Sequence, residues 1–273
     1  MFVQSLIMIK VGGVIDNFCI MPPQKLIEVS FEKIFICVSR EFRFRAIKEQ
    51  LLDMGIAKEK IVTMSTSKEY QDAFIELDPI RKKWIKAFAD YTKNRGLSGS
   101  IAECGVFYGE TAMFMNKYWS NRTLHLFDTF EGFEEEDIAY ESDAFCAFKN
   151  GQFIKNPFKV DKPEIQIEIV KNRMSYPENL KIHKGYFPNS TDGVEDRFCF
   201  VNLDMDLYQP QLEGLRFFWN RMVNGGAILL HDYFHPELPG VQVAVEDFEK
   251  ELNRNLPKIP IGDFCSIAII KCD

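Results

Sequence analysis

The sequence predicts an α/β fold, in which a mostly parallel, Rossmann-like sheet carries helices on both faces. Short apolar runs alternate with segments of helical spacing over most of the chain, and several of these runs end in acidic or glycine-rich segments. Such alternation is typical of strands and helices that build a parallel sheet. In an open sheet of this kind, ligands bind outside the carboxyl ends of the strands. The 273 residues are enough for one large domain and a smaller unit.

Composition and charge narrow the class of protein. Hydrophobic residues make up 46% of the chain, so we expect a sizeable core. The net charge of −7 argues against a nucleic-acid partner, which would require a basic face. We expect no membrane span, because no apolar run reaches the length of one, and no secretory signal. The seven cysteines lack paired spacing and predict reduced thiols in a cytoplasmic protein; those inside apolar runs include Cys37, Cys104, Cys199 and Cys265.

Residues 1–75 are predicted to form a small Rossmann-like unit that is truncated or degenerate. The predicted elements are a strand end over 11–17, strands over 31–39 and 60–63, and a helix over 41–54. Strand, helix and strand make half of a nucleotide-binding fold. Because no Gly-x-Gly-x-x-Gly loop accompanies them, we expect a docking surface and no bound nucleotide.

The second predicted domain spans residues 76–273. Its first helix, over 80–94, places Trp84, Phe88 and Tyr91 on one face. Residues 129–158 are predicted to be a long irregular segment, whose aromatic side chains favour a lid over a substrate site. Further helices are predicted over 110–119, 161–175, 211–222 and 241–252, and strands from 101 and over 123–127, 180–183, 198–203, 227–230 and 266–270.

A glycine turn between the first strand and helix of this domain is the first candidate ligand site. Residues 101–109 read Ile-Ala-Glu-Cys-Gly-Val-Phe-Tyr-Gly. A Cβ at Gly105 or Gly109 would keep a ligand away from the backbone. The next strand ends at Asp128, which can accept hydrogen bonds from a ribose diol. The glycine spacing suits S-adenosylmethionine better than a dinucleotide, although such glycines are equally often plain turn residues.

Acidic and imidazole side chains end two later strands. Asp204 and Asp206 follow one apolar run, and His231 and Asp232 follow the next. Asp204, His231 and Asp232 could therefore supply three ligands to one divalent cation, with Mg²⁺ or Mn²⁺ suited to carboxylate oxygens. The alternative is that these acids only face water and cap the following helices. Of the other histidines, two are expected to be structural and one to lie at the surface: His125, His183 and His235.

Together these segments resemble the macrocin O-methyltransferase family over roughly residues 80–271. The matching motifs are the glycine segment 101–109, Phe-Asp-Thr-Phe-Glu-Gly-Phe at 127–133, Lys-Gly-Tyr-Phe-Pro at 184–188, Asn-Leu-Asp-Met-Asp-Leu-Tyr at 202–208 and Gly-Gly-Ala-Ile-Leu-Leu-His-Asp-Tyr at 225–233. The resemblance implies a class I methyltransferase domain that uses S-adenosylmethionine and a divalent metal to methylate sugar hydroxyls. Where the family typically has Asp-Asp-Tyr, this chain has His231, Asp232 and Tyr233, a change that bears on the metal.

The resemblance also implies roles for individual residues. Glu103, Gly105, Gly109 and Asp128 are the cofactor-binding candidates, and Asp204 with the pair 231–232 would hold the metal. The expected acceptor is a sugar or glycosylated metabolite, and a metal would lower the pKa of its hydroxyl. Without a metal, Asp204 would be the catalytic base. Two rival functions stay open, a non-catalytic scaffold with this fold and a nicotinamide-dependent sugar enzyme, and so does assembly into a homo-oligomer.

Overall fold

The computed structural model divides the chain into two compact units, Met1–Glu76 and Leu77–Asp273. The residues that it describes are 13–15, 18–20, 25, 34–35, 41–62, 79–145, 156, 158–160 and 162–272. Cys37 and the predicted domain boundary at residues 75–76 lie outside these ranges. No helix in the described ranges is long and apolar enough to cross a membrane.

The smaller unit contains the predicted strand, helix and strand. Its parallel strands β3 and β4 are connected through α1, and a short 3-10 turn, η2, precedes β4. An antiparallel hairpin, β1 with β2, was not predicted as a pair. The rest of the strands predicted over 11–17 and 31–39 lies outside the described residues. The bounds are β1 Gly13–Ile15, β2 Phe18–Ile20, β3 Ile34–Phe35, α1 Glu41–Asp53, η2 Lys58–Lys60 and β4 Ile61–Val62.

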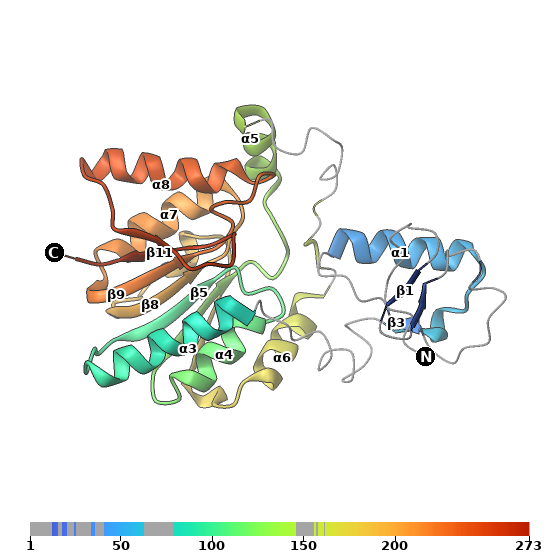
Figure 1. Cartoon of the computed structure of the whole chain (residues 1–273), viewed down its shortest axis with the longest axis horizontal. Coiled ribbons are helices and arrows are strands. Elements are labelled where there is room, and N and C mark those ends of the chain that lie inside the picture. The colour runs from blue at the N-terminus through green and yellow to red at the C-terminus, as the bar shows by residue number, and fades with distance from the viewer. Residues whose placement is uncertain are drawn as a thin grey trace. The chain divides into compact units, whose positions relative to one another are not determined.

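A seven-stranded sheet in the order β10-β11-β9-β8-β5-β6-β7 forms the centre of the larger unit (Figure 1). The strands from β9 to β7 are mutually parallel, and β11 runs antiparallel to both of its neighbours. The parallel strands therefore follow a 3-2-1-4-5 order, which reverses between β5 and β8; a ligand crevice is expected at this reversal. The bounds are β5 Ser100–Cys104, β6 Leu124–Asp128, β7 Leu180–Lys184, β8 Phe198–Leu203, β9 Met222–Leu230, β10 Lys258–Pro260 and β11 Ile267–Ile270.

Helices cover both faces of this sheet, as predicted. Figure 1 shows α7 and α8 on one face and α3, α4 and α6 on the other, while α5 lies beside the beginnings of α7 and α8. Short 3-10 turns, η3 and η4, flank β7. The bounds are α3 Pro79–Asn94, α4 Glu110–Tyr118, α5 Glu135–Phe145, α6 Pro163–Arg173, η3 Pro177–Asn179, η4 Asn189–Thr191, α7 Tyr208–Trp219 and α8 Pro239–Leu252.

The core lies mainly between the sheet and the pair α7 and α8. Every residue of β8 is buried, including Asn202, which fits its central position in the sheet. Phe198 packs edge-on against Phe218 of α7, with ring centroids 5.0 Å apart. Burying one such ring is worth about 1.5–3 kcal/mol. This packing holds α7 against the beginning of β8, the strand that leads to Asp204.

Three predictions about elements were wrong. Residues 135–145 form α5, whereas the whole segment 129–158 was predicted to be irregular. Strand β9 begins at Met222 and runs through Gly225 and Gly226, whereas a strand was predicted only over 227–230. A Cβ at Gly226 would lie 2.9 Å from the carbonyl oxygen of Cys199, so this glycine permits close packing on β8. The short edge strand β10 was not predicted.

His125 and His183, each predicted to be structural, contact each other in the sheet. The ring nitrogens Nδ1 of His125 and Nε2 of His183 lie 3.0 Å apart, and Nε2 of His125 lies 2.9 Å from Asp196 Oδ2. Burial lowers the pKa of both imidazoles, to about 4 for His183. Both rings are therefore neutral at physiological pH and belong to the packing of β6 and β7.

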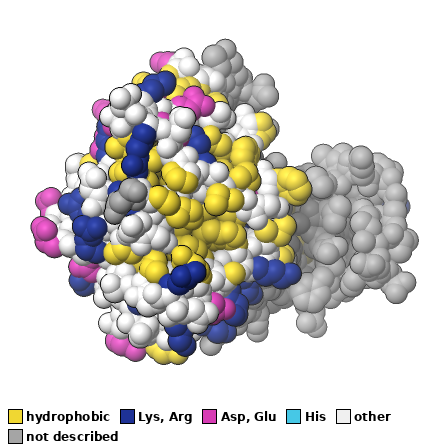
Figure 2. Space-filling view, turned by 60° about the vertical axis from the view of Figure 1, so that its left-hand side comes forward, with side chains coloured by type: hydrophobic (Ala, Val, Ile, Leu, Met, Phe, Trp, Pro, Cys, Tyr) yellow, Lys and Arg dark blue, Asp and Glu magenta, His cyan; other side chains and the backbone are white. Residues whose placement is uncertain are grey.

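The predicted aromatic face of α3 is also present. Trp84 stacks on Phe88 with ring centroids 5.3 Å apart, and Phe88 contacts Phe200 of β8. Figure 2 shows a face of the protein on which hydrophobic side chains gather, with lysine and arginine around them. Large hydrophobic side chains that are exposed include Tyr91 on α3 and Ile259 on β10.

Candidate active site

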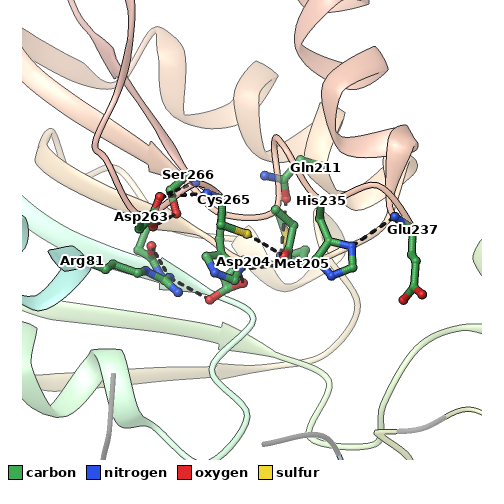
Figure 3. Close-up of polar contacts among 12 residues, drawn as sticks. Arg81, Asp204, Met205, Gln211, His235, Glu237, Asp263, Cys265 and Ser266 are labelled. Atoms are coloured by element: carbon green, nitrogen blue, oxygen red, sulfur yellow. Dashed lines mark hydrogen bonds and ion pairs between the residues drawn. The ribbon is translucent and has the colours of Figure 1, made fainter. Parts of the chain in front are cut away.

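A buried polar network occupies the reversal point between β5 and β8. Nδ2 of Asn202 donates to Oε1 of Glu103 at 2.9 Å. Nη2 of Arg81 donates to Oδ1 of Asn202 at 2.9 Å and to Oδ2 of Asp204 at 2.8 Å (Figure 3). Arg81 comes from the first turn of α3, so three elements contribute to one network. Sequence reasoning identified Glu103 and Asp204 but missed Arg81.

Within this network, burial of the Glu103 carboxyl is the least offset by hydrogen bonds and opposite charges. Burial raises the pKa of Glu103 to about 8, and the charge of Asp204 adds to this effect, while Arg81 opposes it. Its second oxygen, Oε2, is buried and has no hydrogen-bond partner among the described residues. Leaving a buried acceptor unmet is costly, which favours a ligand that brings a donor to it.

A second polar group begins at Asp204 and extends to the end of β9. Nδ1 of His231 lies 3.0 Å from Oδ1 of Asp204 and 2.9 Å from Oδ2 of Asp232. Burial alone would lower the pKa of His231, but these two carboxylates outweigh burial and raise it well above 6.5. Burial opposes ionisation of Asp204, yet His231 and Arg81 overcome it and lower the pKa of that carboxyl. The predicted trio Asp204, His231 and Asp232 is thus in direct contact.

Asp206 brings a third carboxylate to this group. Asp204, Asp206 and Asp232 each offer an oxygen, and these three oxygens lie within 4.8 Å of one another. Burial and the neighbouring charges of Asp232 and Asp204 raise the pKa of Asp206 well above its usual value. Gln211 accepts the backbone N–H of Met205 at 3.4 Å and so steadies the turn between the first two acids (Figure 3). The three oxygens are suited in type to a divalent cation.

Cys265 completes the group from the loop between β10 and β11. Its Sγ donates to Oδ1 of Asp232 at 3.3 Å, and His231, Asp232 and Cys265 form a second set of potential ligands. This thiol was predicted to be a core cysteine, and it is only half-buried, whereas Cys104 and Cys199 are buried as predicted. His235 was expected at the surface; it is half-buried, and its Nδ1 accepts the N–H of Glu237 (Figure 3).

The glycine turn lies directly against this acidic group. Gly105 has φ +81°, and a Cβ there would lie 1.9 Å from the carbonyl oxygen of Asp204. At Gly109, with φ +78°, a Cβ would lie 3.2 Å from Cγ1 of Val170 on α6. Ligand access to the backbone, the predicted reason for these glycines, stays a prediction, and these contacts add a second reason. Both glycines make room for neighbouring parts of the protein, and they adopt a backbone conformation that other residues disfavour.

Asp128 holds the same glycine turn from the end of β6. Its Oδ2 accepts the N–H groups of Val106 at 2.6 Å and Phe107 at 2.9 Å, and its Oδ1 accepts that of Phe130 at 2.7 Å. Burial raises the pKa of Asp128, and these three N–H groups oppose the rise. Each carboxylate oxygen has two lone pairs, so Oδ1 retains capacity for a further donor. Besides the ribose-binding role expected for it, the carboxyl group of Asp128 therefore anchors the glycine turn.

The sheet order and the polar network at its reversal point define a class I methyltransferase fold. The sequence profile of the Macrocin-O-methyltransferase (TylF) family matches residues 79–267. The chain belongs to this family, and it is an S-adenosylmethionine-dependent O-methyltransferase.

Solved structures of similar fold include two enzymes of this kind. The O-methyltransferase NovP aligns with a TM-score of 0.59 and 18% identity, over 71% of this chain and 80% of its own. The calicheamicin methyltransferase CalS11 aligns with a TM-score of 0.55 and 14% identity, over 85% of this chain and 93% of its own. A second structure of CalS11 describes that protein as a TDP-rhamnose 3'-O-methyltransferase. No curated protein matches the chain significantly.

Proposed function

We propose that this enzyme transfers the methyl group of S-adenosylmethionine to a hydroxyl group of a sugar or glycosylated small molecule. The observation that carries the proposal is the contact between Gly105 and Asp204, whose carbonyl oxygen fills the space of a Cβ. This contact joins the turn expected to bind the methyl donor to the acids expected to receive the acceptor. Family membership and the sugar acceptor named for CalS11 support the choice of substrate class.

The residues around the glycine turn fit the cofactor. The unpaired Oε2 of Glu103 offers an acceptor to the cofactor's amino group, and the positive charge of that group would favour the ionised carboxylate. Asp128 would accept hydrogen bonds from the ribose diol, and Gly105 and Gly109 would shape the turn between Glu103 and Asp128. When bound, S-adenosylmethionine supplies a methyl group on a sulfonium sulfur, which is open to attack by an oxygen nucleophile. The protein orients the two reactants.

Asp204, His231 and Asp232 are proposed to hold a divalent metal, with Asp206 as an additional carboxylate. Carboxylates are hard ligands that suit Mg²⁺ or Mn²⁺, while the imidazole nitrogen favours Mn²⁺ or Co²⁺ over Mg²⁺. A bound divalent ion would lower the pKa of the acceptor hydroxyl. Arg81 already neutralises part of the charge of Asp204, which should weaken the hold on a cation.

The alternative is a metal-free site, in which a side chain takes the proton of the acceptor hydroxyl. Asp204 was the predicted base, but the pKa of its carboxyl is lowered by His231 and Arg81, which makes it a weak proton acceptor. His231 is the stronger base, although it can accept a proton only when its ring is neutral. This alternative therefore requires a methylation rate that rises with pH.

For residues 1–75, the proposal is a docking surface that binds no nucleotide. The described part contains a parallel strand pair joined through α1, together with a short antiparallel hairpin. Neither connection contains the Gly-x-Gly-x-x-Gly sequence that cradles a pyrophosphate. The unit would bind the catalytic unit or a second copy of the chain.

Replacing Asp128 with asparagine should weaken the binding of S-adenosylhomocysteine by about 1–3 kcal/mol, the usual cost of losing a hydrogen bond to a charged group. The exposed acid Glu131 lies three residues further on and pairs with Lys184, so Glu131→Gln is the matched control and should leave affinity unchanged. Isothermal calorimetry on the full chain measures both. Absence of binding to the parent protein would contradict the proposed function, and equal affinity in Asp128→Asn would remove this residue from the ribose role.

Chelation should abolish methyl transfer, and Mn²⁺ or Co²⁺ should restore it better than Mg²⁺. His231→Asp should shift the preference towards Mg²⁺, because a carboxylate replaces the nitrogen ligand. Metal binding must displace the proton of His231, so affinity should fall as the pH is lowered. The sequence alone suggests that this fall lies below about pH 6.5, and the raised pKa of His231 moves it to higher pH. Full transfer to TDP-sugars in excess chelator would rule out the metal.

A further inference from the structure

Phe264, in the loop between β10 and β11, is the most exposed large hydrophobic side chain in the described ranges. It is 91% exposed, and its backbone has φ +60°, in the left-handed region. A phenylalanine there combines an unburied ring with a backbone conformation that asparagine or glycine adopts more readily. Neither feature helps the fold. Residues held in this way cluster at sites that bind ligands.

The loop is held rigidly by its own side chains. Oδ1 of Asp263 accepts the N–H groups of Cys265 at 3.0 Å and Ser266 at 2.7 Å, and its Oδ2 accepts the hydroxyl of Ser266 at 2.6 Å (Figure 3). The N–H of Ile261 donates to the carbonyl of Ser266 at 3.3 Å and closes the turn. Phe264 is therefore presented on a fixed support.

The same loop borders the acidic group of the active site. Cys265, the next residue along the chain, places its Sγ 3.3 Å from Oδ1 of Asp232. Burial would raise the pKa of Asp263, on the other side of Phe264, but hydrogen bonds from Ser266 and Cys265, and last the charge of His231, lower it. Consecutive Cα atoms lie about 3.8 Å apart, so the backbone of Phe264 is within one residue of a side chain that contacts the site.

A second exposed aromatic residue is tied to this loop. The N–H of Phe234 donates to the carbonyl of Cys265 at 3.0 Å, and the Phe234 side chain is 46% exposed. Phe234 lies two residues after Asp232, which itself has φ +59°. Its ring packs edge-on against Tyr233, with centroids 4.9 Å apart. Two exposed aromatic residues thus lie on two loops that are hydrogen-bonded to each other, and each is within two residues of a side chain of the polar group.

We propose that Phe264 and Phe234 form an acceptor-binding surface, on which the apolar face of the acceptor packs while its hydroxyl lies at the acidic group. The inference rests on the proposed function and specifies the acceptor further. The acceptor should present a flat apolar surface close to the methylated hydroxyl, either the C–H face of the sugar ring or a ring attached to that sugar. Sites for small molecules commonly combine aromatic walls with a few polar groups that fix orientation.

The test compares the parent protein with Phe264→Asn, which removes the ring and suits the left-handed backbone. The probes are pairs of 4-nitrophenyl and methyl glycosides of rhamnose, glucose and galactose, measured by saturation-transfer NMR with saturating S-adenosylhomocysteine. We expect Phe264→Asn to bind the 4-nitrophenyl glycosides about tenfold more weakly. Its affinity for S-adenosylhomocysteine and its thermal midpoint should not fall. Loss confined to the nitrophenyl probes identifies the attached ring as the occupant, and an equal loss for the methyl glycosides identifies the sugar face.

Tyr91→Ala is the matched control, because it removes another exposed aromatic ring, from α3. It should leave glycoside binding unchanged. Equal glycoside affinity in the parent and Phe264→Asn would overturn the proposal, as would a parent that binds S-adenosylhomocysteine but none of the glycosides. A change of oligomeric state in Phe264→Asn, with glycoside binding intact, would also overturn it and assign the ring to an interface between copies. A parent that fails to bind S-adenosylhomocysteine refutes the proposed function instead, since that measurement does not involve Phe264.

Discussion

Gly105→Ala is expected to destabilise the larger unit by about 2–5 kcal/mol, the sum of a left-handed backbone penalty and forced overpacking. The new Cβ would lie 1.9 Å from the carbonyl oxygen of Asp204, and a backbone atom cannot move aside as a side chain can. Strands β5 and β8 would have to separate at their carboxyl ends, where we propose that the methyl donor and the acceptor meet. Urea unfolding of the full chain measures the loss, and calorimetry should show that the remaining folded protein binds S-adenosylhomocysteine poorly.

Gly193→Ala separates the two contributions. Gly193 has a similar φ of +76°, but nothing lies within 4 Å of its added Cβ. Only the backbone penalty applies there, so the expected loss is about 1–2 kcal/mol. Equal destabilisation of the two variants would show that the contact with Asp204 is not tight in solution.

Arg81→Met should be almost as damaging, with a loss of about 3–5 kcal/mol, because it leaves buried carboxyl groups without their cationic partner. Arg81 is 4% exposed, and its guanidinium donates to both Asn202 and Asp204. The loss should also depend on pH. The pKa of Asp204 is lowered in the folded state, so its pairing adds stability above pH 3.8, and this stability disappears as the pH falls through the lowered pKa. The parent and Arg81→Met should therefore converge on acidification.

Arg216→Met provides the control for removing an arginine. Arg216 pairs with Glu213 and Glu251 on the surface, and all three side chains are partly exposed. Such surface pairs contribute about 0–1 kcal/mol. Denaturant unfolding at pH 7 and at about pH 2, below the unfolded pKa of an aspartate, distinguishes the two variants. A loss at Arg81 no larger than that at Arg216, or one that is the same at both pH values, would contradict a buried charge network.

The acids of the site could be predicted from the sequence because each follows an apolar run. The end of an apolar run marks the end of a strand, and parallel strands bring their carboxyl ends to one edge of the sheet. Arg81 was missed because the helix over 80–94 was interpreted from its aromatic face, which does not include Arg81. The spacing of α3 did contain a signal for it. The buried positions of this helix, which recur at helical spacing, are Arg81, Ile85, Ala89 and Thr92. A charged residue in such a buried row requires a partner of opposite charge or a hydrogen-bond acceptor. The partner of Arg81, 123 residues away, could not be named from spacing.

Helix α5 illustrates a different limit. Its first turn contains Glu135, Glu136 and Asp137, and acids favour a helix N-terminus, yet the local sequence reads equally well as a solvated loop. The deciding contact is tertiary. Glu141 is fully buried, it accepts the backbone N–H of Tyr208, and its carboxylate occupies the space that a side chain at Gly240 would need. Such an arrangement, between the starts of α7 and α8, has no signature in the spacing of residues along the chain.

Helix α3 has a consequence for how the catalytic unit can be excised or transplanted. By its place in the sequence it precedes the first strand of the sheet and resembles a dispensable leader. It nevertheless carries the guanidinium that reaches Asn202 and Asp204 from Arg81, the third residue of the helix. A recombinant fragment that begins even a few residues after Pro79 would keep all seven strands of the sheet but would lose the guanidinium of Arg81. A fragment that contains the whole catalytic unit therefore has to start before Pro79, and a gene fusion should place its junction before that proline.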